Sequence, residues 1–169
     1  RVGAPEFVLP RGNGCYATYR SFTGGAVPAP GEGPAAEELR AMATGAFLPA
    51  DVVAWMESLP LFHEDEHAIY VHAGLPSDGE RWLHPSEVKD PRPLLWQRSR
   101  AFYEGYSGKR VVFGHTPVRK LPQEQSSHTP ADPLDVYFTP SLVGLDTGAG
   151  MGGFLSAVEL PSLTVFDSR

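Results

Sequence analysis

The sequence predicts a mixed fold of the α/β or α+β class. Short apolar runs at 69–71, 111–113 and 142–145 each end just before a glycine-containing loop, which is typical of buried strands. Segments with helical spacing of apolar residues, at 49–59 and 93–103, lie between or before these runs. The 18 glycines and 17 prolines predict many loops between the elements.

The first third of the chain is expected to combine extended stretches with short helices. Residues 7–9 and 16–22 are interpreted as extended segments. A short helix is predicted at 37–42. A longer one is predicted at 49–59, because its apolar residues recur at helical spacing and a proline ends it. Trp55 lies beside that apolar stripe and is expected to be a core residue.

Strands dominate the prediction for the rest of the chain. An acidic turn between two apolar segments predicts a hairpin, and later runs predict further strands; the segments are 61–63, 68–71, 110–113, 142–145, 154–160 and 163–166. Two stretches rich in glycine, proline or polar residues, 24–34 and 123–140, are predicted to be surface loops.

Composition excludes several classes of protein. The 14 basic and 20 acidic residues give a net charge of −6, which argues against a nucleic-acid or anionic-membrane surface. The single cysteine, Cys15, excludes a disulfide framework and a four-cysteine zinc site. No apolar run approaches the roughly 18 residues of a membrane span. We therefore expect a cytoplasmic protein that binds neither nucleic acid nor membrane.

Two histidines occupy similar positions after predicted strands. His72 follows Ile-Tyr-Val and precedes a glycine, and His115 follows Val-Val-Phe-Gly. Imidazoles at strand ends can bind a divalent metal ion when their other nitrogen is oriented by a neighbour. They are too far apart in sequence for a local zinc motif, so the fold would have to bring them together. The alternative is that each is a hydrogen-bonded packing residue.

Four blocks of residues occur in an informative order. They are Val-His-Ala-Gly at 71–74, Leu-Leu-Trp-Gln-Arg at 94–98, Val-Phe-Gly-His-Thr-Pro at 112–117 and Leu-Asp-Thr-Gly-Ala at 145–149. This order, within residues 67–160, resembles the metallophosphoesterases (the calcineurin-like superfamily). It looks most like the bacterial and phage serine/threonine protein phosphatases, and the symmetrical dinucleoside tetraphosphate hydrolases are close relatives.

The resemblance implies an architecture and a site. Residues 1–169 would form the C-terminal portion of a single metallophosphoesterase domain, itself a four-layer α/β/β/α sandwich. His72 and His115 match two metal ligands, and Arg98 matches an arginine that binds the substrate phosphate. The cofactor would be two divalent metal ions, Mn²⁺ first, with Fe, Zn or Ni as alternatives. Asp146 matches a residue that is mainly structural and closes a turn.

The implied activity is metal-dependent hydrolysis of a phosphoester. In the family, two metal ions about 3.5–4 Å apart polarise the phosphate and activate a water molecule that attacks phosphorus in line. The substrate of the complete protein is expected to be a phosphoprotein, dephosphorylated at serine or threonine. The alternative within the same chemistry is a symmetrical dinucleoside tetraphosphate hydrolase.

The sequence also departs from the family. The blocks Asp-x-His-Gly, Gly-Asp-x-x-Asp-Arg-Gly and Gly-Asn-His-Glu supply most metal ligands and the general-acid histidine. The first two are absent. Asn13 matches either the asparagine of the third or, better, a turn residue that follows it. No catalytic residue is therefore assigned in this chain. An N-terminal half is expected to precede Arg1 or to come from a partner, and self-association is a further expectation. The competing hypothesis is an inactive fragment that acts as a binding module.

Overall fold

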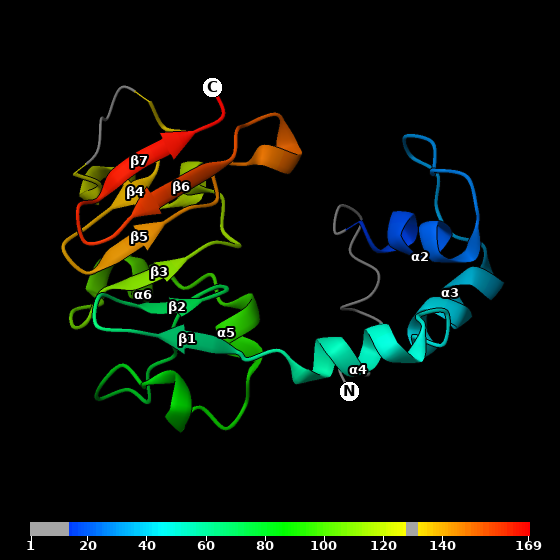
Figure 1. Ribbon diagram of the computed structural model, residues 1–169, viewed down its shortest axis with the longest axis horizontal. Helices are drawn as coiled ribbons and strands as arrows, with labels where there is room; N and C mark the ends of the chain where they lie inside the picture. The colour runs from blue at the N-terminus through cyan, green and yellow to red at the C-terminus, as the bar shows by residue number, and fades with distance from the viewer. Residues whose placement is uncertain (1–13, 128–131) are drawn as a thin grey trace. The chain divides into compact units, whose positions relative to one another are not determined.

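The computed structural model describes residues 14–127 and 132–169 (Figure 1). The chain divides into two compact units, Arg1–Leu59 and Pro60–Arg169, which are described separately. Within the described ranges, no helix combines the length and the apolar character needed to cross a membrane. The expectation for residues 7–9 and the assignment of Asn13 lie outside the described residues.

The first unit contains three helices, α2 (Cys15–Thr23), α3 (Ala36–Thr44) and α4 (Ala50–Ser58). The predicted helices at 37–42 and 49–59 are confirmed. The prediction of an extended segment at 16–22 is wrong, because this stretch forms α2. Glycines in left-handed conformation flank α2, at 14 with φ 74° and at 24 with φ 73°, and a left-handed glycine such as Gly24 commonly ends a helix at its C-terminus. Residues 24–34 form neither helix nor strand.

Polar contacts link α2 to α3. Arg20 donates from Nε to Glu38 Oε1 at 2.7 Å, and the Tyr16 hydroxyl donates to Glu38 Oε2 at 3.0 Å. Met42 is buried, but α4 contains no buried residue and Trp55 is 61% exposed. The prediction that Trp55 belongs to a core is therefore wrong. Three nine-residue helices have too little apolar surface to enclose a core of their own.

The second unit is built on a five-stranded sheet with the order β1-β2-β3-β5-β4 (Figure 1). The strands are β1 (Phe62–Glu64), β2 (Ile69–Val71), β3 (Val111–Phe113), β4 (Tyr137–Phe138) and β5 (Leu142–Gly144). The central strands β2, β3 and β5 are parallel, and the edge strands β1 and β4 are antiparallel to their neighbours. The predicted hairpin is confirmed as β1 and β2, and the predicted strands at 110–113 and 142–145 are confirmed as β3 and β5.

The segment 123–140 is not entirely a surface loop. It contains β4, and both of its residues are buried. A strand of two residues is too short to show the alternation that identifies strands in a sequence. Pairing with β5 is what makes this stretch a strand.

Helices cover one face of the sheet. They are α5 (Arg92–Trp96) and α6 (Arg100–Gly105), which overlap the segment 93–103 that was predicted to be helical. Side chains alternate along each strand, so Ile69 and Val71 point to this face while Tyr70 points to the other. The resulting core also contains Leu75, Leu94, Phe102, Tyr103, Val111, Phe113, Val118, Leu121, Tyr137 and Leu142.

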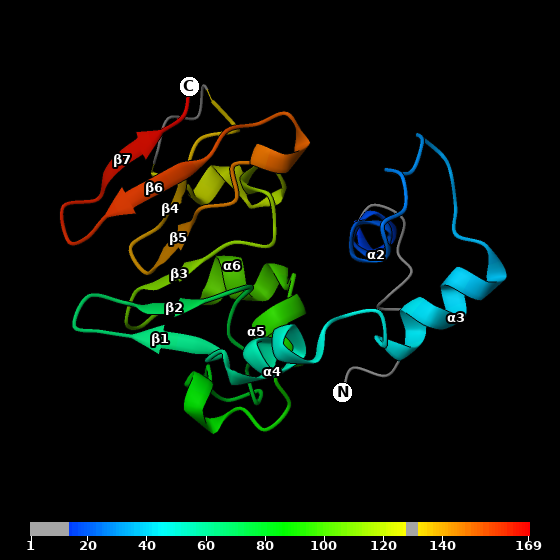
Figure 2. The same cartoon turned by 45° about the vertical axis from the view of Figure 1, so that its right-hand side comes forward.

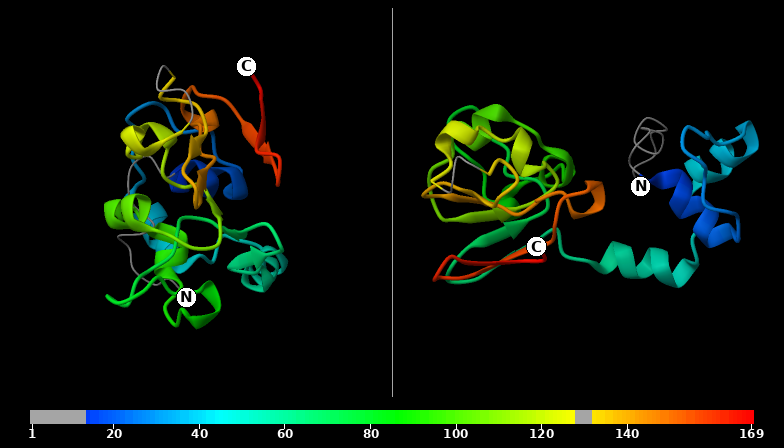
Figure 3. Two further views of the ribbon diagram at one scale, coloured as in Figure 1. Left: turned by 90° about the vertical axis from the view of Figure 1, so that its left-hand side faces the viewer. Right: turned by 90° about the horizontal axis from the view of Figure 1, so that it is seen from above.

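A two-stranded hairpin packs against the opposite face (Figures 2 and 3). It consists of β6 (Ser156–Glu159) and β7 (Thr164–Asp167), which confirms the predicted closing strand pair. Val158 and Val165 of the hairpin pack on a cluster that includes Val112 and Val143. The second unit therefore has three layers, and the chain belongs to the α/β class as predicted.

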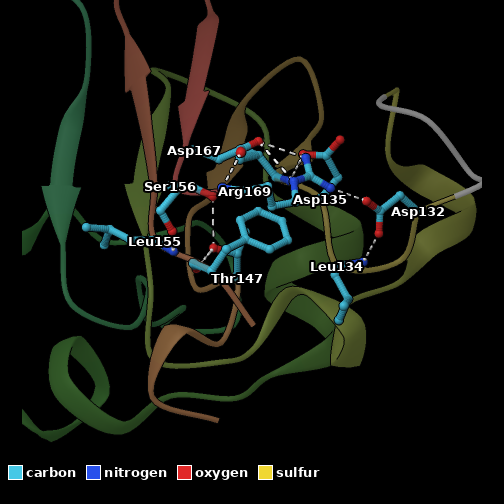
Figure 4. Close-up of polar contacts among 11 residues, drawn as sticks. Asp132, Leu134, Asp135, Thr147, Leu155, Ser156, Asp167 and Arg169 are labelled. Atoms are coloured by element: carbon cyan, nitrogen blue, oxygen red, sulfur yellow. Dashed lines mark hydrogen bonds and ion pairs between the residues drawn. The ribbon is translucent and has the colours of Figure 1, made fainter. Parts of the chain in front are cut away.

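Arg169 joins the hairpin to the loop before β4 (Figure 4). Its guanidinium binds Asp167 at 2.8 Å, pairs with Asp132, and lies 3.5 Å from Asp135. It also lies over the ring of Phe154, 4.0 Å from the centroid. The surrounding carboxylates raise the pKa of Arg169. This cluster connects three separate segments of the chain.

Candidate functional site

The fold brings the two predicted histidines together. His72 directly follows β2 and His115 follows β3 by one residue, and the two strands are parallel neighbours. Their carboxyl ends therefore meet at one edge of the sheet. His72 Nε2 lies 3.2 Å from His115 Nδ1, and the ring centroids are 5.0 Å apart. His72 is exposed and His115 is half-buried.

Backbone hydrogen bonds fix the loops that carry these histidines. The Gly114 N–H donates to the carbonyl of His72 at 3.0 Å, which extends the pairing of the two strands beyond their ends. The backbone of His115 is left-handed, with φ 63°. Such a conformation is uncommon for a residue with a side chain, although histidine adopts it more readily than most, and residues held in it cluster at functional sites. The turn at His115 directs its ring toward His72.

Arg98 reaches the same place from the helix-covered side. Its Nε lies 3.2 Å from His115 Nε2. The segment before it is tied to the loop after His72, because the Gln97 side chain donates to the Leu75 carbonyl at 2.7 Å. Gly74 allows this close approach, since a Cβ there would lie 3.0 Å from Gln97 Nε2 and 2.9 Å from the Phe102 ring. The structure therefore groups His72, His115 and Arg98, the three residues that the sequence singled out.

The hydrogen bond from Arg98 selects one tautomer of His115. An arginine can only donate, so His115 Nε2 must present a lone pair and the proton resides on Nδ1, facing His72. Burial lowers the pKa of His115, and the neighbouring charges of Arg98 and His72 lower it further. His115 is consequently favoured in its neutral form, which is the form that binds metal ions.

Asp146 has the structural role that was expected. Its carboxylate accepts a hydrogen bond from the Gly148 N–H at 3.1 Å, and its carbonyl accepts one from Val118 N at 2.9 Å. These bonds close the turn after β5 and hold the loop that follows His115. Asp146 also acts on His115 electrostatically, and its negative charge opposes the lowering of the histidine pKa.

The pair lacks further ligands within the described part of the chain. Among residues 14–127 and 132–169, no three or more histidine, cysteine, aspartate or glutamate side chains gather closely enough to hold a metal ion. Sequence reasoning gave no role to Trp96, although its ring meets that of His115 edge-on at 5.5 Å. The sequence signal that could have identified Trp96 is its position inside the block 94–98, two residues before Arg98.

An apolar groove of about 500 Å³ adjoins His72. It lies on the hairpin side of the sheet, over β1, β2 and β3, where β6 and β7 do not reach. Its lining includes Leu61, Phe62, Tyr70 and Leu145, and Leu61 is 44% exposed. The hairpin therefore leaves an apolar part of this sheet face uncovered beside the histidine pair.

No protein-family model matches the chain, and no curated protein matches it. One similar solved structure is provisionally assigned as a diadenosine tetraphosphatase, with 18% sequence identity and a TM-score of 0.45. The match covers 76% of this chain and 60% of that one, so the chain spans less than two thirds of the matched protein. A likeness at this level assigns neither a family nor an activity.

Proposed function

We propose that this chain contributes a histidine pair and a phosphate-binding arginine to a metal-dependent phosphoester hydrolase. The observation that carries the proposal is the 3.2 Å separation of His72 Nε2 and His115 Nδ1. Two nitrogens that ligate one tetrahedral metal at about 2.0–2.1 Å are separated by about 3.3 Å. The separation of 3.2 Å therefore suits shared binding of a single divalent cation.

Two imidazoles hold only part of a metal site. Each ion of the expected pair needs several ligands, and the described residues add none to this pair. The proposed cofactor is still two divalent ions, Mn²⁺ first, with the remaining ligands supplied from outside the described residues. When bound, such ions polarise a phosphate oxygen and activate water. The apolar groove beside His72 supports a completing N-terminal half, or a second copy, as the proposed partner.

Arg98 is proposed to bind the substrate phosphate. Its guanidinium offers a planar fork of donors that suits phosphate oxygens. Among the described residues, only His115 forms a hydrogen bond with the Arg98 side chain, and it does so through Nε. Ligation of a metal through His115 Nδ1 requires the proton to move to Nε2, which then can no longer accept from Arg98. Metal binding to His115 would thus break the hydrogen bond that holds Arg98 and leave its guanidinium available to a phosphate.

The proposed substrate is a phosphoprotein, hydrolysed at phosphoserine or phosphothreonine by the completed enzyme. Symmetrical hydrolysis of a dinucleoside tetraphosphate is the alternative. In both reactions His72 and His115 would hold the metal and Arg98 the phosphate. The chain alone is expected to behave as a binding module, because its described residues provide only part of a metal-ligand set.

Metal titration of the chain tests the proposal. We expect the wild-type protein to bind one Mn²⁺ or Zn²⁺ ion weakly, as measured by calorimetry. His72→Ala and His115→Ala should each abolish this binding, whereas the control His67→Ala should retain it. Unchanged binding in both variants of the pair would contradict the assignment.

Activity provides a second test. Residues 1–169 alone should not hydrolyse p-nitrophenyl phosphate in Mn²⁺ at an ordinary rate. A normal rate from the isolated chain would show that the metal site is complete without further ligands. Rescue of hydrolysis by an added N-terminal half, lost again with Arg98→Gln, is the expected positive result.

A further inference from the structure

We propose that a hollow next to the histidine pair is a second anion subsite, which binds the adjacent phosphate of a condensed phosphate chain. The hollow has a volume of about 340 Å³. Three cationic side chains line it, those of Arg98, Arg100 and Lys120, together with Glu124. Its size falls within the range of small-ligand pockets. The inference rests on the proposed function, since Arg98 is assigned there to the first phosphate. Of the two substrates proposed there, it favours the alternative, a dinucleoside tetraphosphate, over a phosphoprotein.

Two of the three cations in the hollow have no ion-pair partner among the described residues. Arg100 is engaged by carboxylates, at 2.5 Å from Glu104 and 3.0 Å from Glu124. Arg98 and Lys120, in contrast, form no ion pair with any described residue. The chain as a whole carries a net charge of −6. Two unpaired cations that line one hollow in an acidic chain favour an anionic ligand.

Arg98 makes the hollow continuous with the histidine pair. Its Nε faces His115, while the same side chain forms part of the lining of the hollow. A guanidinium has five N–H donors arranged in a plane, so it can contact two neighbouring anionic groups. A phosphate held by Arg98 at the histidines would therefore have its neighbour inside the hollow.

The remaining walls are held in place. Tyr103 and Thr116 are buried, and their hydroxyl groups are hydrogen-bonded at 2.9 Å. Lys120 belongs to the 3-10 turn Val118–Lys120, whose first residue donates to the Asp146 carbonyl at 2.9 Å. The turn that carries Lys120 is thereby attached to the same strand-end loops as the histidines. The lysine side chain itself is exposed and available to a ligand.

A condensed phosphate fits this arrangement better than a phosphopeptide. Successive phosphates in a phosphoanhydride chain each carry negative charge and are separated by one bridging oxygen. A phosphopeptide carries its next acidic group on a separate side chain, with neutral backbone between the two charges. The cations here line a single small hollow, which matches densely spaced charge.

Metal-free binding measurements test the subsite. Inorganic tripolyphosphate should bind wild-type protein about tenfold more tightly than orthophosphate at fixed ionic strength, because it reaches both cations. Lys120→Gln should remove that advantage and leave orthophosphate binding unchanged. Arg98→Gln should weaken both ligands. Lys89→Gln, which removes an exposed lysine outside the hollow, is the matched control and should change neither.

Two further ligands identify the source of the phosphate chain. Adenosine tetraphosphate that binds with the same dependence on Lys120 as tripolyphosphate would assign the subsite to the phosphate chain itself, whether free or attached to a nucleoside. A phosphoserine peptide with acidic neighbours should show no dependence on Lys120. Dependence for the peptide alone would overturn the proposal.

Two outcomes of the binding measurements would overturn the anion subsite. Equal affinities for tripolyphosphate and orthophosphate, or equal effects of Lys120→Gln and Lys89→Gln, would overturn the subsite. These measurements use no metal, so they remain interpretable if the chain proves unable to bind metal or to support hydrolysis. The metal titrations of His72→Ala and His115→Ala, in turn, do not depend on Lys120. Failure of the subsite and failure of the proposed function are therefore distinguishable.

Discussion

The two faces of the five-stranded sheet are covered to different extents. On the helix-covered face, α5 and α6 enclose a continuous cluster of buried side chains, with Leu94 and Phe102 fully buried. On the other face the hairpin covers only part of the sheet, and the apolar groove over β1 to β3 remains. The candidate site lies at the strand ends beside that groove. The larger apolar core thus lies on the helix-covered face, whereas the other face is only partly covered.

The largest expected effect comes from the helix-covered face. Phe102 is fully buried and its ring meets those of Trp82, Tyr103, Tyr106 and Phe113. Phe102→Ala should lower the free energy of unfolding by about 3–5 kcal/mol, because it removes a large apolar side chain and leaves a cavity. Urea denaturation followed by circular dichroism measures this.

The matched change on the other face is Leu61→Ala, which should cost less than about 1 kcal/mol because Leu61 is 44% exposed in the groove. Equal losses of unfolding free energy in Phe102→Ala and Leu61→Ala would refute the view that the two faces differ in their contribution to stability. If Phe102→Ala does not fold, Phe102→Leu should still lose more stability than Leu61→Ala.

Alkaline pH should weaken the helix-covered face through Tyr137. Burial raises the pKa of this hydroxyl to about 12. The unfolded chain releases the proton near pH 10, so stability is fully present below pH 10 and is lost as the pH rises toward 12, by an amount on the order of 2 kcal/mol. Denaturation at several pH values measures the loss. Tyr137→Phe should remove most of this dependence, and an unchanged dependence would contradict it.

A smaller effect is expected where the hairpin is tied to the chain. Arg169→Ala removes ion pairs with Asp132 and Asp167 and the contact with the Phe154 ring. Because Arg169 is partly exposed, the loss should be much smaller than that of Phe102→Ala. Hydrogen exchange should show faster opening of β6 and β7. The control Arg92→Ala, which removes a pair with Asp90 alone, should leave the hairpin amides unchanged.

The smallest effect is expected at low pH, from Glu87. Hydrogen bonds from Arg81 lower the pKa of Glu87 to about 2. A lowered pKa in the folded state means that the stabilisation is present above about pH 4.5 and is lost as the pH falls toward 2. Glu87→Gln should flatten this part of the pH profile only slightly, since both partners are exposed. A large change would show that this exposed pair contributes more than its setting suggests.

Strands with clear apolar runs could be predicted from the sequence, and so could the edge at which the histidines meet. Val111–Phe113 is buried on both faces, which gives a continuous apolar run before Gly114. β4 could not be found because two residues carry no periodicity, and its burial comes from β5, which follows it. The segment 16–22 is ambiguous because its aromatic residues suit a strand as well as a helix.

The candidate site was only partly predictable for a similar reason. His72 and His115 were found because each stands where a strand ends. Lys120 was not singled out, since its importance comes from sharing a hollow with Arg98, a residue 22 positions earlier. Trp55 was misassigned because helical spacing indicates an apolar face without showing what, if anything, covers it.

The left-handed backbone at His115 limits how this edge could be redesigned. Among residues with side chains, asparagine and aspartate adopt positive φ most readily. His115→Asn and His115→Asp should therefore preserve the turn better than His115→Ala. Both replace an imidazole nitrogen with an oxygen ligand, and oxygen favours Mg²⁺, Ca²⁺ or Mn²⁺ over softer ions. The left-handed backbone at position 115 thus favours substitutions that retain a metal ligand but change which cations the site prefers.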